Sequence, residues 1–510
     1  MNNFQLAIKD LIKDKVKTLA DLDSAKRRIC KKYRISTPSN INLLKAYHNL
    51  LKNKSIKQSK NLEYLLVKRR VRSLSGIVNV SILTKPYDCP GKCIFCPSQK
   101  GVPKSYLAKE PAVQRALLTC FDPKKQIKAR LEGLAMAGHP TDKIELRIIG
   151  GTWSYYDKKY QTWFITNCFA CCNNSKKISS LEEEQKKNEK AKHRIIGLTI
   201  ETRPDFIDIK EIKRLRELGV TRVELGVQSI YNDVLKKNKR GHTVKETIKA
   251  TKLLKDAGFK ISYQIMPNLP GSSFKKDVEM FKELFSNPNF QPDLLKIYPL
   301  GLVKQSALYK WYKKKKYRPY SKQKLIKLLT EIKKHISYYV RIERVIRDIP
   351  AADIVAGGVK TSNLREIVQK QVKCKCIRCR EVKDLPSLKL RQDKELFLFR
   401  HDYFASGGKE IFLSFENKNR TKLYALLRLR ISKNSAIVRE IHTYGQMVPI
   451  AKKRKAIQHK GLGKKLMKEA EKIAKDFGAS KIAVIAGIGV RPYFRKLGYK
   501  LENTYMVKKI

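Results

Sequence analysis

Between about residue 76 and residue 350, short apolar runs alternate with longer segments of helical periodicity, and this alternation most constrains the fold. Buried parallel strands read as continuous apolar runs, and helices are the usual connections between them. We therefore expect a barrel-like α/β domain. The predicted strands are 77–83, 144–149, 195–200, 222–227, 261–266 and 294–298, and predicted helices include 124–137, 209–218 and 244–257.

Three closely spaced cysteines, Cys89, Cys93 and Cys96, follow the first predicted strand. Their x3 and x2 spacing places three thiolates on one short loop. A 4Fe–4S cluster with three protein ligands leaves one iron open, and an open iron can bind and reduce S-adenosylmethionine. The spacing is the signature of radical SAM enzymes and predicts that cluster here. Structural zinc is the alternative, but it normally has four protein ligands, and the next candidates are Cys120 and His139.

Polar or glycine-bearing loops follow the next predicted strands, and barrel chemistry takes place at the carboxyl ends of strands. Gly150 and Gly151 allow close backbone approach to a ligand, so we expect them to accept the amino group of S-adenosylmethionine. Glu201 and Gln228 are predicted contacts to the same ligand. A simple turn and solvated loop residues are the alternative interpretation.

A second cysteine group, Cys374, Cys376 and Cys379, lies between the predicted barrel and the C-terminal part. It predicts a structural zinc that ties two domains together, with His401 or His442 as the fourth ligand. Reduced cysteines without a metal are the alternative. We assign no role to a third group, Cys168, Cys171 and Cys172.

A glycine-bearing segment, residues 458–463, precedes a predicted helix whose apolar positions keep helical spacing up to Gly478. Free backbone N–H groups at such a helix start can hold a pyrophosphate. Together with a predicted strand at 482–486 and the segment 491–499, this order indicates a GNAT acyl-CoA domain. Tyr493 is a candidate hydroxyl donor near the thioester sulfur, although a lone aromatic residue also fits packing.

The chain is strongly basic, with 111 Lys and Arg against 46 Asp and Glu and a net charge of +65. This is more than solubility requires and favours a polyanionic partner. Residues 1–80 hold 19 Lys or Arg and 5 Asp or Glu, with runs at 26–28, 31–32 and 68–70. We expect this region to bind nucleic acid through phosphates. A general lysine bias over solvated surfaces is the alternative.

With 510 residues, of which 42% are hydrophobic, the chain can supply several cores. It contains no apolar stretch as long as a membrane span and no signal-peptide pattern at its start. We therefore expect a multidomain cytoplasmic protein with reduced cysteines.

The two predicted halves, joined by the Cys-x-Cys-x-x-Cys segment, resemble over nearly the full length the catalytic subunit of Elongator, including its single-subunit archaeal, bacterial and viral forms. The matching segments are 85–86, 142–145, 150–152, 198–205, 224–229, 266–271, 439–445 and 481–485. Two segments depart from the family pattern. Pro97-Ser98-Gln99 replaces the common Pro-Gly-Gly, and Phe494 follows Tyr493 where the family often has a second tyrosine, which leaves Tyr493 as the only candidate hydroxyl there.

The resemblance implies an enzyme that forms carboxymethyluridine at the wobble position of tRNA from S-adenosylmethionine and acetyl-CoA. In the mechanism proposed for the family, a deoxyadenosyl radical abstracts hydrogen from the acetyl methyl group, the acetyl radical adds to carbon 5 of the uridine, and the thioester is hydrolysed. The expected domains are a basic helical tRNA-binding region (1–75), a radical SAM partial (β/α) barrel (76–360), a zinc-binding linker (361–395) and a GNAT-like α/β domain (396–510).

The family match also implies the acetyl-CoA contacts. Lys143 on the barrel and Tyr493 on the GNAT side are the implied catalytic residues. The implied acetyl-CoA contacts are Lys143, Glu440, Ile441, His442, Thr443, Gly461, Leu462, Gly463 and Tyr493.

Two other functions also fit the sequence. A protein lysine acetyltransferase with a structural cluster needs a general base, and Glu440 is the only glutamate that stands out. A non-catalytic tRNA-binding scaffold is disfavoured because the cluster cysteines and the glycine segment are intact. The sequence leaves open the tRNA species, accessory subunits and oligomeric state.

Overall fold

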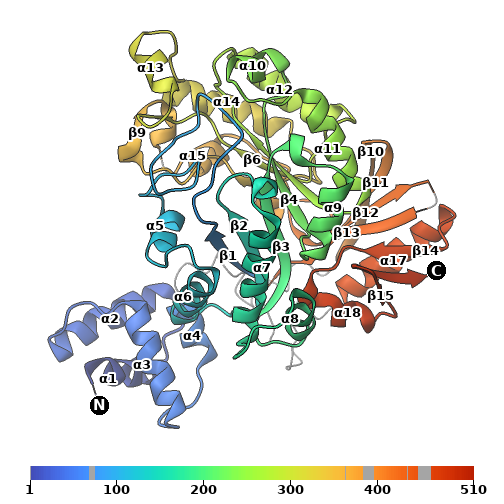
Figure 1. The fold of residues 1–510 in the computed structure, drawn as a ribbon. Coiled ribbons are helices and arrows are strands. Elements are labelled where there is room, and N and C mark those ends of the chain that lie inside the picture. The colour runs from blue at the N-terminus through green and yellow to red at the C-terminus, as the bar shows by residue number, and fades with distance from the viewer. Residues whose placement is uncertain (1, 68–74, 362, 383–394, 434, 446–460) are drawn as a thin grey trace.

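The computed structural model describes residues 2–67, 75–361, 363–382, 395–433, 435–445 and 461–510. Three predicted features therefore lie wholly or partly outside the described residues: the basic run 68–70, residues 458–460 of the glycine segment, and positions 362 and 383–394 of the linker. The described chain forms a helical N-terminal part, a parallel α/β part and a C-terminal α/β part (Figure 1).

The N-terminal part consists of four helices, α1 (Asn3–Lys13), α2 (Leu19–Tyr33), α3 (Asn40–Lys52) and α4 (Lys60–Leu66). Each begins after a residue whose side chain accepts a backbone N–H hydrogen bond, as an N-cap does: Asn2, Thr18, Ser39 and Ser59. Apolar residues from all four helices form a separate core. The part rests on the α/β part through α3 and α6.

The central sheet is parallel and has the strand order β1-β2-β3-β4-β5-β6-β8. Its strands are β1 (Val78–Leu83), β2 (Lys143–Ile149), β3 (Arg194–Thr202), β4 (Arg222–Gln228), β5 (Lys260–Ile265), β6 (Leu294–Ile297) and β8 (Arg341–Arg344). The predicted half-barrel is confirmed, and its first six strands were located from sequence. The last strand was missed because three of its four residues are charged.

Helices connect and cover these strands: α5 (Pro111–Leu117), α6 (Pro123–Met136), α7 (Lys158–Asn173), α8 (Leu181–Asn188), α9 (Ile209–Glu217), α10 (Asn232–Lys237), α11 (Val244–Asp256), α12 (Phe274–Ser286), α13 (Leu308–Lys313), α14 (Lys322–Lys334), α15 (Leu364–Gln371) and α16 (Ile377–Arg380). A small antiparallel pair, β7 (Leu302–Val303) and β9 (Ile354–Ala356), lies beside α13. Within the described residues, no helix combines the length and hydropathy needed to cross a bilayer.

The C-terminal part is a second seven-stranded sheet with the order β10-β11-β12-β13-β14-β16-β15. Its elements are β10 (Phe397–Ala405), β11 (Gly408–Glu416), β12 (Leu423–Ser432), β13 (Ser435–Thr443), α17 (Leu462–Asp476), β14 (Lys481–Val484), α18 (Arg491–Arg495), β15 (Lys500–Glu502) and β16 (Tyr505–Lys509). Strand β14 is shorter than the predicted 482–486. The chain must turn there because Gly487 packs on the β3 backbone, where an added Cβ would lie 2.1 Å from the carbonyl oxygen of Ile196.

Buried ion pairs join the two α/β parts. Arg439 on β13 donates to Asp293 before β6 (Nη1 to Oδ1, 2.9 Å) and to Glu410 on β11 (Nη1 to Oε2, 2.8 Å). Arg430 on β12 pairs with Asp256 at the end of α11 (2.5 Å). All but Asp256 are almost inaccessible to solvent. The parts are therefore held in one fixed arrangement, because separating them would leave buried charges unpaired.

We expect the stability of this interface to fall in acid. Burial alone would raise the pKa of Glu410, but Arg439, Lys255 and Arg430 lower this pKa from 4.5 to about 2. A depressed folded-state pKa contributes stability above pH 4.5 that is lost as the pH falls from 4.5 toward 2. Urea unfolding followed across this range should show the loss, and Glu410→Gln should flatten it; an equally steep loss in that variant would contradict the assignment.

Candidate functional site

The three predicted cluster cysteines lie on the loop that leaves the carboxyl end of β1. An added Cβ at Gly91 would lie 3.6 Å from the sulfur of Cys89 and 3.5 Å from that of Cys93, so both sulfurs surround the same point. Cys96 is half-buried, and desolvation raises the pKa of its thiol to about 11. The loop thus gathers its thiols at the rim of the sheet.

Two arginines that sequence reasoning missed lie against this loop. Arg240 donates from Nη1 to the Cys93 sulfur (3.5 Å). Arg203 is held by Asp205 (Nε to Oδ1, 2.9 Å), and its buried Nη1 has no hydrogen-bond partner among the described residues. Three thiols, two cations and an unpaired donor fit an anionic iron–sulfur cluster. Arg203 lies within the matched segment 198–205, whereas nothing in the sequence distinguishes Arg240 from the many other arginines.

The predicted S-adenosylmethionine residues lie at the ends of neighbouring strands. Gly150 and Gly151 follow β2 with φ of 136° and 113°, a conformation that favours glycine. Glu201 and Gln228 line a cavity of about 710 Å³ inside the half-barrel, together with Phe95 of the cysteine loop. The cysteine loop and two of the four predicted residues therefore open onto one cavity.

Glu201 is already positioned by protein groups. Tyr106 donates its hydroxyl to Oε2 (2.8 Å), Gln264 donates to Oε1 (3.3 Å), and Lys296 lies 3.6 Å from Oε1. Burial raises the pKa of Glu201, and Lys296 opposes the shift. This ordered carboxylate faces the cavity. Its contact with S-adenosylmethionine stays a prediction.

Four of the implied acetyl-CoA contacts lie close together in the C-terminal part. An added Cβ at Gly463 would lie 3.0 Å from the Tyr493 hydroxyl, 3.8 Å from Ile441 and 3.9 Å from Thr443. Strand β13 pairs with β14 only up to Val438. Beyond Val438, the edge of β13 that faces away from β12 has no pairing with β14 and carries backbone groups that can bind an extended ligand.

The side chains of Glu440 and His442 contact other protein groups. Glu440 receives a hydrogen bond from Arg428 (2.8 Å) and pairs with Lys260 (3.4 Å). Although burial opposes it, these cations hold the pKa of Glu440 far below its usual range. Burial lowers the pKa of His442 to about 4, and its ring packs on Tyr444 with centroids 4.3 Å apart. Glu440 is therefore a poor general base for lysine acetylation.

Lys143 is the first residue of β2 and lies at the end of the sheet that faces the GNAT part. It pairs in register with Arg194, and an added Cβ at Gly489, ahead of α18, would lie 2.6 Å from the Cβ of Arg194. Burial lowers the pKa of Lys143. The length of β2, about 20 Å at the usual rise per residue, separates Lys143 from the cysteine end, so the two predicted half-sites occupy opposite ends of the barrel.

Charged residues fill the barrel interior between these ends. Arg222 pairs with Glu145 (2.9 Å) and Glu343 (3.0 Å), and Arg147 pairs with Glu224 (2.5 Å). Lys296 then bridges Glu224 and Glu201. The interior is polar from the β2 start to the cavity, in contrast to the apolar packing usual inside a closed barrel.

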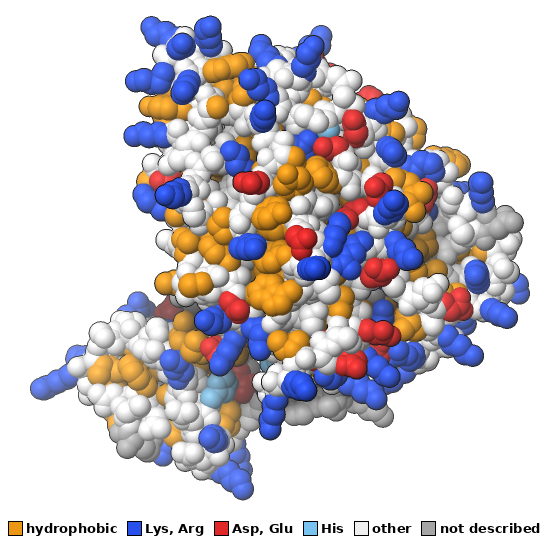
Figure 2. Space-filling model, in the orientation of Figure 1, with side chains coloured by type: hydrophobic (Ala, Val, Ile, Leu, Met, Phe, Trp, Pro, Cys, Tyr) orange, Lys and Arg blue, Asp and Glu red, His pale blue; other side chains and the backbone are white. Residues whose placement is uncertain are grey.

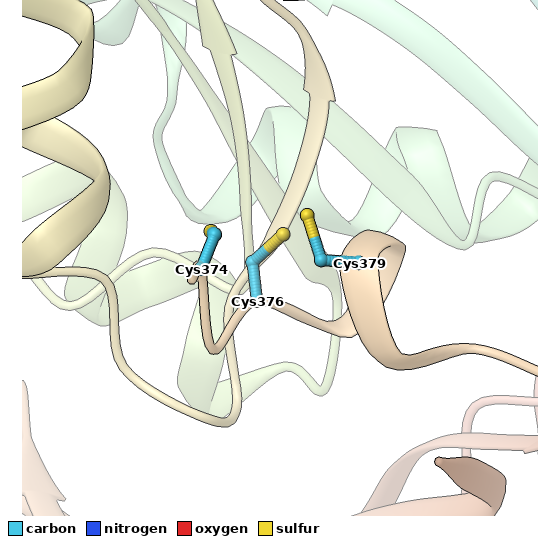
Figure 3. A group of neighbouring side chains, drawn as sticks. All are labelled: Cys374, Cys376 and Cys379. Carbon is cyan, nitrogen blue, oxygen red and sulfur yellow. The ribbon is translucent and has the colours of Figure 1, made fainter. Parts of the chain in front are cut away.

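The second cysteine group is brought together as predicted from its spacing. The sulfurs of Cys374, Cys376 and Cys379 lie within 4.8 Å of one another on the loop before α16 and on α16 itself (Figure 3). Among the described residues no histidine joins them, so the fourth-ligand assignments were wrong. His401 instead packs beside the rings of Tyr339 and Tyr403.

The third cysteine group belongs to the core. Cys168 and Cys172 on α7 are buried among apolar residues, and Cys171 donates to the Lys124 carbonyl (3.4 Å). Burial raises the pKa of all three thiols. They are packing residues, as their position on one helix suggests.

Comparison with known families assigns each α/β part. The chain matches the Radical SAM superfamily over residues 84–284, the Radical_SAM C-terminal domain over 292–373 and the Acetyltransferase (GNAT) family over 384–499. It is 49% identical over 476 residues to the tRNA uridine(34) acetyltransferase of Methanocaldococcus jannaschii, covering 88% of each chain. It is 37% identical to Elongator complex protein 3 of Homo sapiens, covering 86% of this chain and 85% of that protein.

A solved structure agrees with these matches. The archaeal Elp3 of Methanocaldococcus infernus, with residues 1–46 deleted, has a TM-score of 0.74 and 45% identity, covering 86% of this chain and 100% of that chain. The fold and the cysteine loop define a radical SAM protein that carries a GNAT acetyltransferase domain. The chain belongs to the family of tRNA uridine(34) acetyltransferases and Elongator complex protein 3, and the predicted resemblance is confirmed.

Proposed function

We propose that this protein joins the methyl carbon of the acetyl group of acetyl-CoA to carbon 5 of uridine 34 in tRNA, and that hydrolysis of the thioester then releases CoA and leaves a carboxymethyl group. The observation that carries the proposal is the presence, on one rigid barrel, of a three-cysteine loop that opens onto a cavity and of a GNAT site at the other end. Relatives named tRNA uridine(34) acetyltransferase support the choice of substrate.

In this proposal Cys89, Cys93 and Cys96 hold a 4Fe–4S cluster, which supplies one-electron reduction of S-adenosylmethionine when both are bound. Arg203 and Arg240 offset the negative charge of the thiolates. Glu201, Gln228 and the Gly150–Gly151 backbone orient the S-adenosylmethionine in the cavity. The acetyl methyl carbon and carbon 5 of the uridine are both unactivated. Joining them requires radical chemistry, which the cluster and S-adenosylmethionine supply and an acetyltransferase fold alone does not.

On the GNAT side, the free edge of β13 from Glu440 to Thr443 binds the pantetheine amides, and the helix start at Gly461, Leu462 and Gly463 binds the pyrophosphate. Lys143 lies across the interface as a cation for the CoA phosphates. Because the two ends of the barrel are separated and charged residues fill the interior between them, the proposal requires the acetyl group to be brought to the cavity.

We expect Tyr493→Phe to slow tRNA-dependent acetyl-CoA hydrolysis roughly 100-fold. This is the lower end of the range of rate losses seen when a general acid is removed. Burial raises the pKa of Tyr493, so its hydroxyl is protonated and can donate near neutral pH. Acetyl-CoA affinity, measured by calorimetry, should change little because the ring is kept. Unchanged hydrolysis would assign Tyr493 to packing.

The remaining cofactors and partners complete the proposal. Cys374, Cys376 and Cys379 hold a structural zinc, with Lys333 and Arg365 near the thiolates. The basic region 1–75 binds tRNA, and a tRNA substrate places the protein in the cytoplasm. Lysine acetylation is disfavoured because Glu440 is committed to two ion pairs.

The proposal is tested by incubating anaerobically reconstituted protein with tRNA, S-adenosylmethionine, a reductant and acetyl-CoA, then digesting the tRNA for nucleoside mass spectrometry. Carboxymethyluridine that requires both small molecules supports it. Its absence, or acetylated lysine as the only product, contradicts it.

A further inference from the structure

Helix α13 and the chain around it form a basic surface that the site described above does not use. We call residues 304–324 the basic projection. It contains nine Lys or Arg and no Asp or Glu, and all nine basic side chains are exposed. Figure 2 shows blue side chains around an apolar group at the end of the molecule where Figure 1 places α13. An acid-free surface of this kind attracts polyanions.

Aromatic side chains lie among these cations. Tyr309, Trp311 and Tyr312 are partly exposed, and the rings of Tyr309 and Tyr312 are stacked with centroids 6.5 Å apart. A surface hollow of about 570 Å³ lies between Tyr312, Lys313, Lys315 and Arg318. Interleaved aromatic and basic side chains are typical of proteins that stack bases and neutralise phosphates of single-stranded nucleic acid.

The basic projection is anchored to the fold. Tyr317 is buried and donates its hydroxyl to the Asn268 carbonyl (2.8 Å), and the buried Tyr320 donates to Asp277 (2.9 Å). A preformed surface loses less entropy when a ligand binds.

Two backbone hydrogen bonds also connect the basic projection to the cysteine loop. The Leu308 N–H donates to the Ile94 carbonyl (2.8 Å), and the Ser98 N–H donates to the Gln305 carbonyl (3.1 Å). Ile94 lies between Cys93 and Cys96, so a ligand on the projection lies beside the cysteine end of the barrel. In Figure 1, α1–α4 and α13 flank the same side of the molecule, with α5 between them.

We propose that the basic projection binds the single-stranded loop of the RNA substrate, with Lys313 to Lys316 on phosphates and Trp311 and Tyr312 on bases. This inference rests on the proposed function and specifies which part of the protein holds the RNA near the target uridine. An acidic protein partner would use the charges but would not need the partly exposed rings, so the observations favour RNA.

The first test measures binding of a synthetic anticodon stem–loop RNA to the full-length protein by fluorescence anisotropy at several salt concentrations. Neutralising Lys313, Lys314, Lys315 and Lys316 together to Gln should weaken binding at least about 10-fold and lower the salt slope by up to about 3. The matched control neutralises four exposed lysines of the GNAT part, Lys468, Lys472, Lys475 and Lys481, and should leave both quantities near wild type. Equal effects from the two variants would overturn the proposal.

A second variant tests the rings separately. Trp311→Ala should weaken binding about 5-fold or more with the salt slope unchanged, since stacking does not release counterions. Unlabelled stem–loop should compete, whereas poly-glutamate of equal charge should not; effective competition by poly-glutamate, or wild-type affinity in both variants, would overturn the proposal. Binding needs neither cofactor, so a failure of the carboxymethylation assay leaves this result interpretable.

Discussion

Replacing Cys93 by alanine should abolish carboxymethyluridine formation. Cys93 is one of only three thiols on the loop, and Arg240 donates to its sulfur. A cluster left with two protein ligands cannot be held in the arrangement that leaves one iron open. The expected result is loss of the iron–sulfur absorbance and of product below the limit of nucleoside mass spectrometry.

Cys120→Ser is the matched control, because Cys120 is exposed and lies outside the cluster loop. It should retain both the absorbance and the product. Product formation by Cys93→Ala at a rate close to that of Cys120→Ser would show that the loop does not hold the reactive group.

The second prediction with a large effect concerns stability and the interface between the two α/β parts. Arg439→Ala should lower the free energy of unfolding by about 3–5 kcal/mol, because Asp293 and Glu410 would lose the buried guanidinium that pairs with both of them. Arg439 also donates to the Phe259 carbonyl (2.9 Å), so it connects β13 to the start of β5. Urea unfolding monitored by tryptophan fluorescence measures the change.

Arg400→Ala provides the comparison within the same sheet. Arg400 pairs with Asp402 (2.8 Å) through a side chain that is 43% exposed, so its loss should cost less than about 1 kcal/mol. If both variants were equally stable, the buried pairs would not be what fixes the GNAT part on the barrel.

Sequence reasoning located the features that depend on local pattern. Strand β3 was located from its clustered apolar residues Ile195, Ile196, Leu198 and Ile200. The helix α17 was predicted from the spacing of Leu462, Leu466, Met467 and Ala470. The cysteine spacing predicted which thiols lie together, because neighbouring ligands on one loop share a location whatever the fold around them.

Features that depend on distant segments were not predictable in this way. The pairing of Arg240 with Cys93 spans 147 positions, and an arginine in a chain this basic carries no signal of its partner. The separation of the two half-sites follows from which end of β2 each occupies, and a list of motifs in chain order does not contain that information. His401 was one of two histidines predicted as the fourth metal ligand, but an aromatic stack positions it elsewhere.

The central claim is that both ends of the barrel serve a single reaction on RNA. The most direct measurement supplies acetyl-CoA with a heavy isotope at both acetyl carbons and follows the label into tRNA nucleosides by mass spectrometry. The account predicts carboxymethyluridine that carries both labelled carbons and forms only when S-adenosylmethionine is present. Label that reaches protein lysines alone, or enters the nucleoside without S-adenosylmethionine, would contradict it.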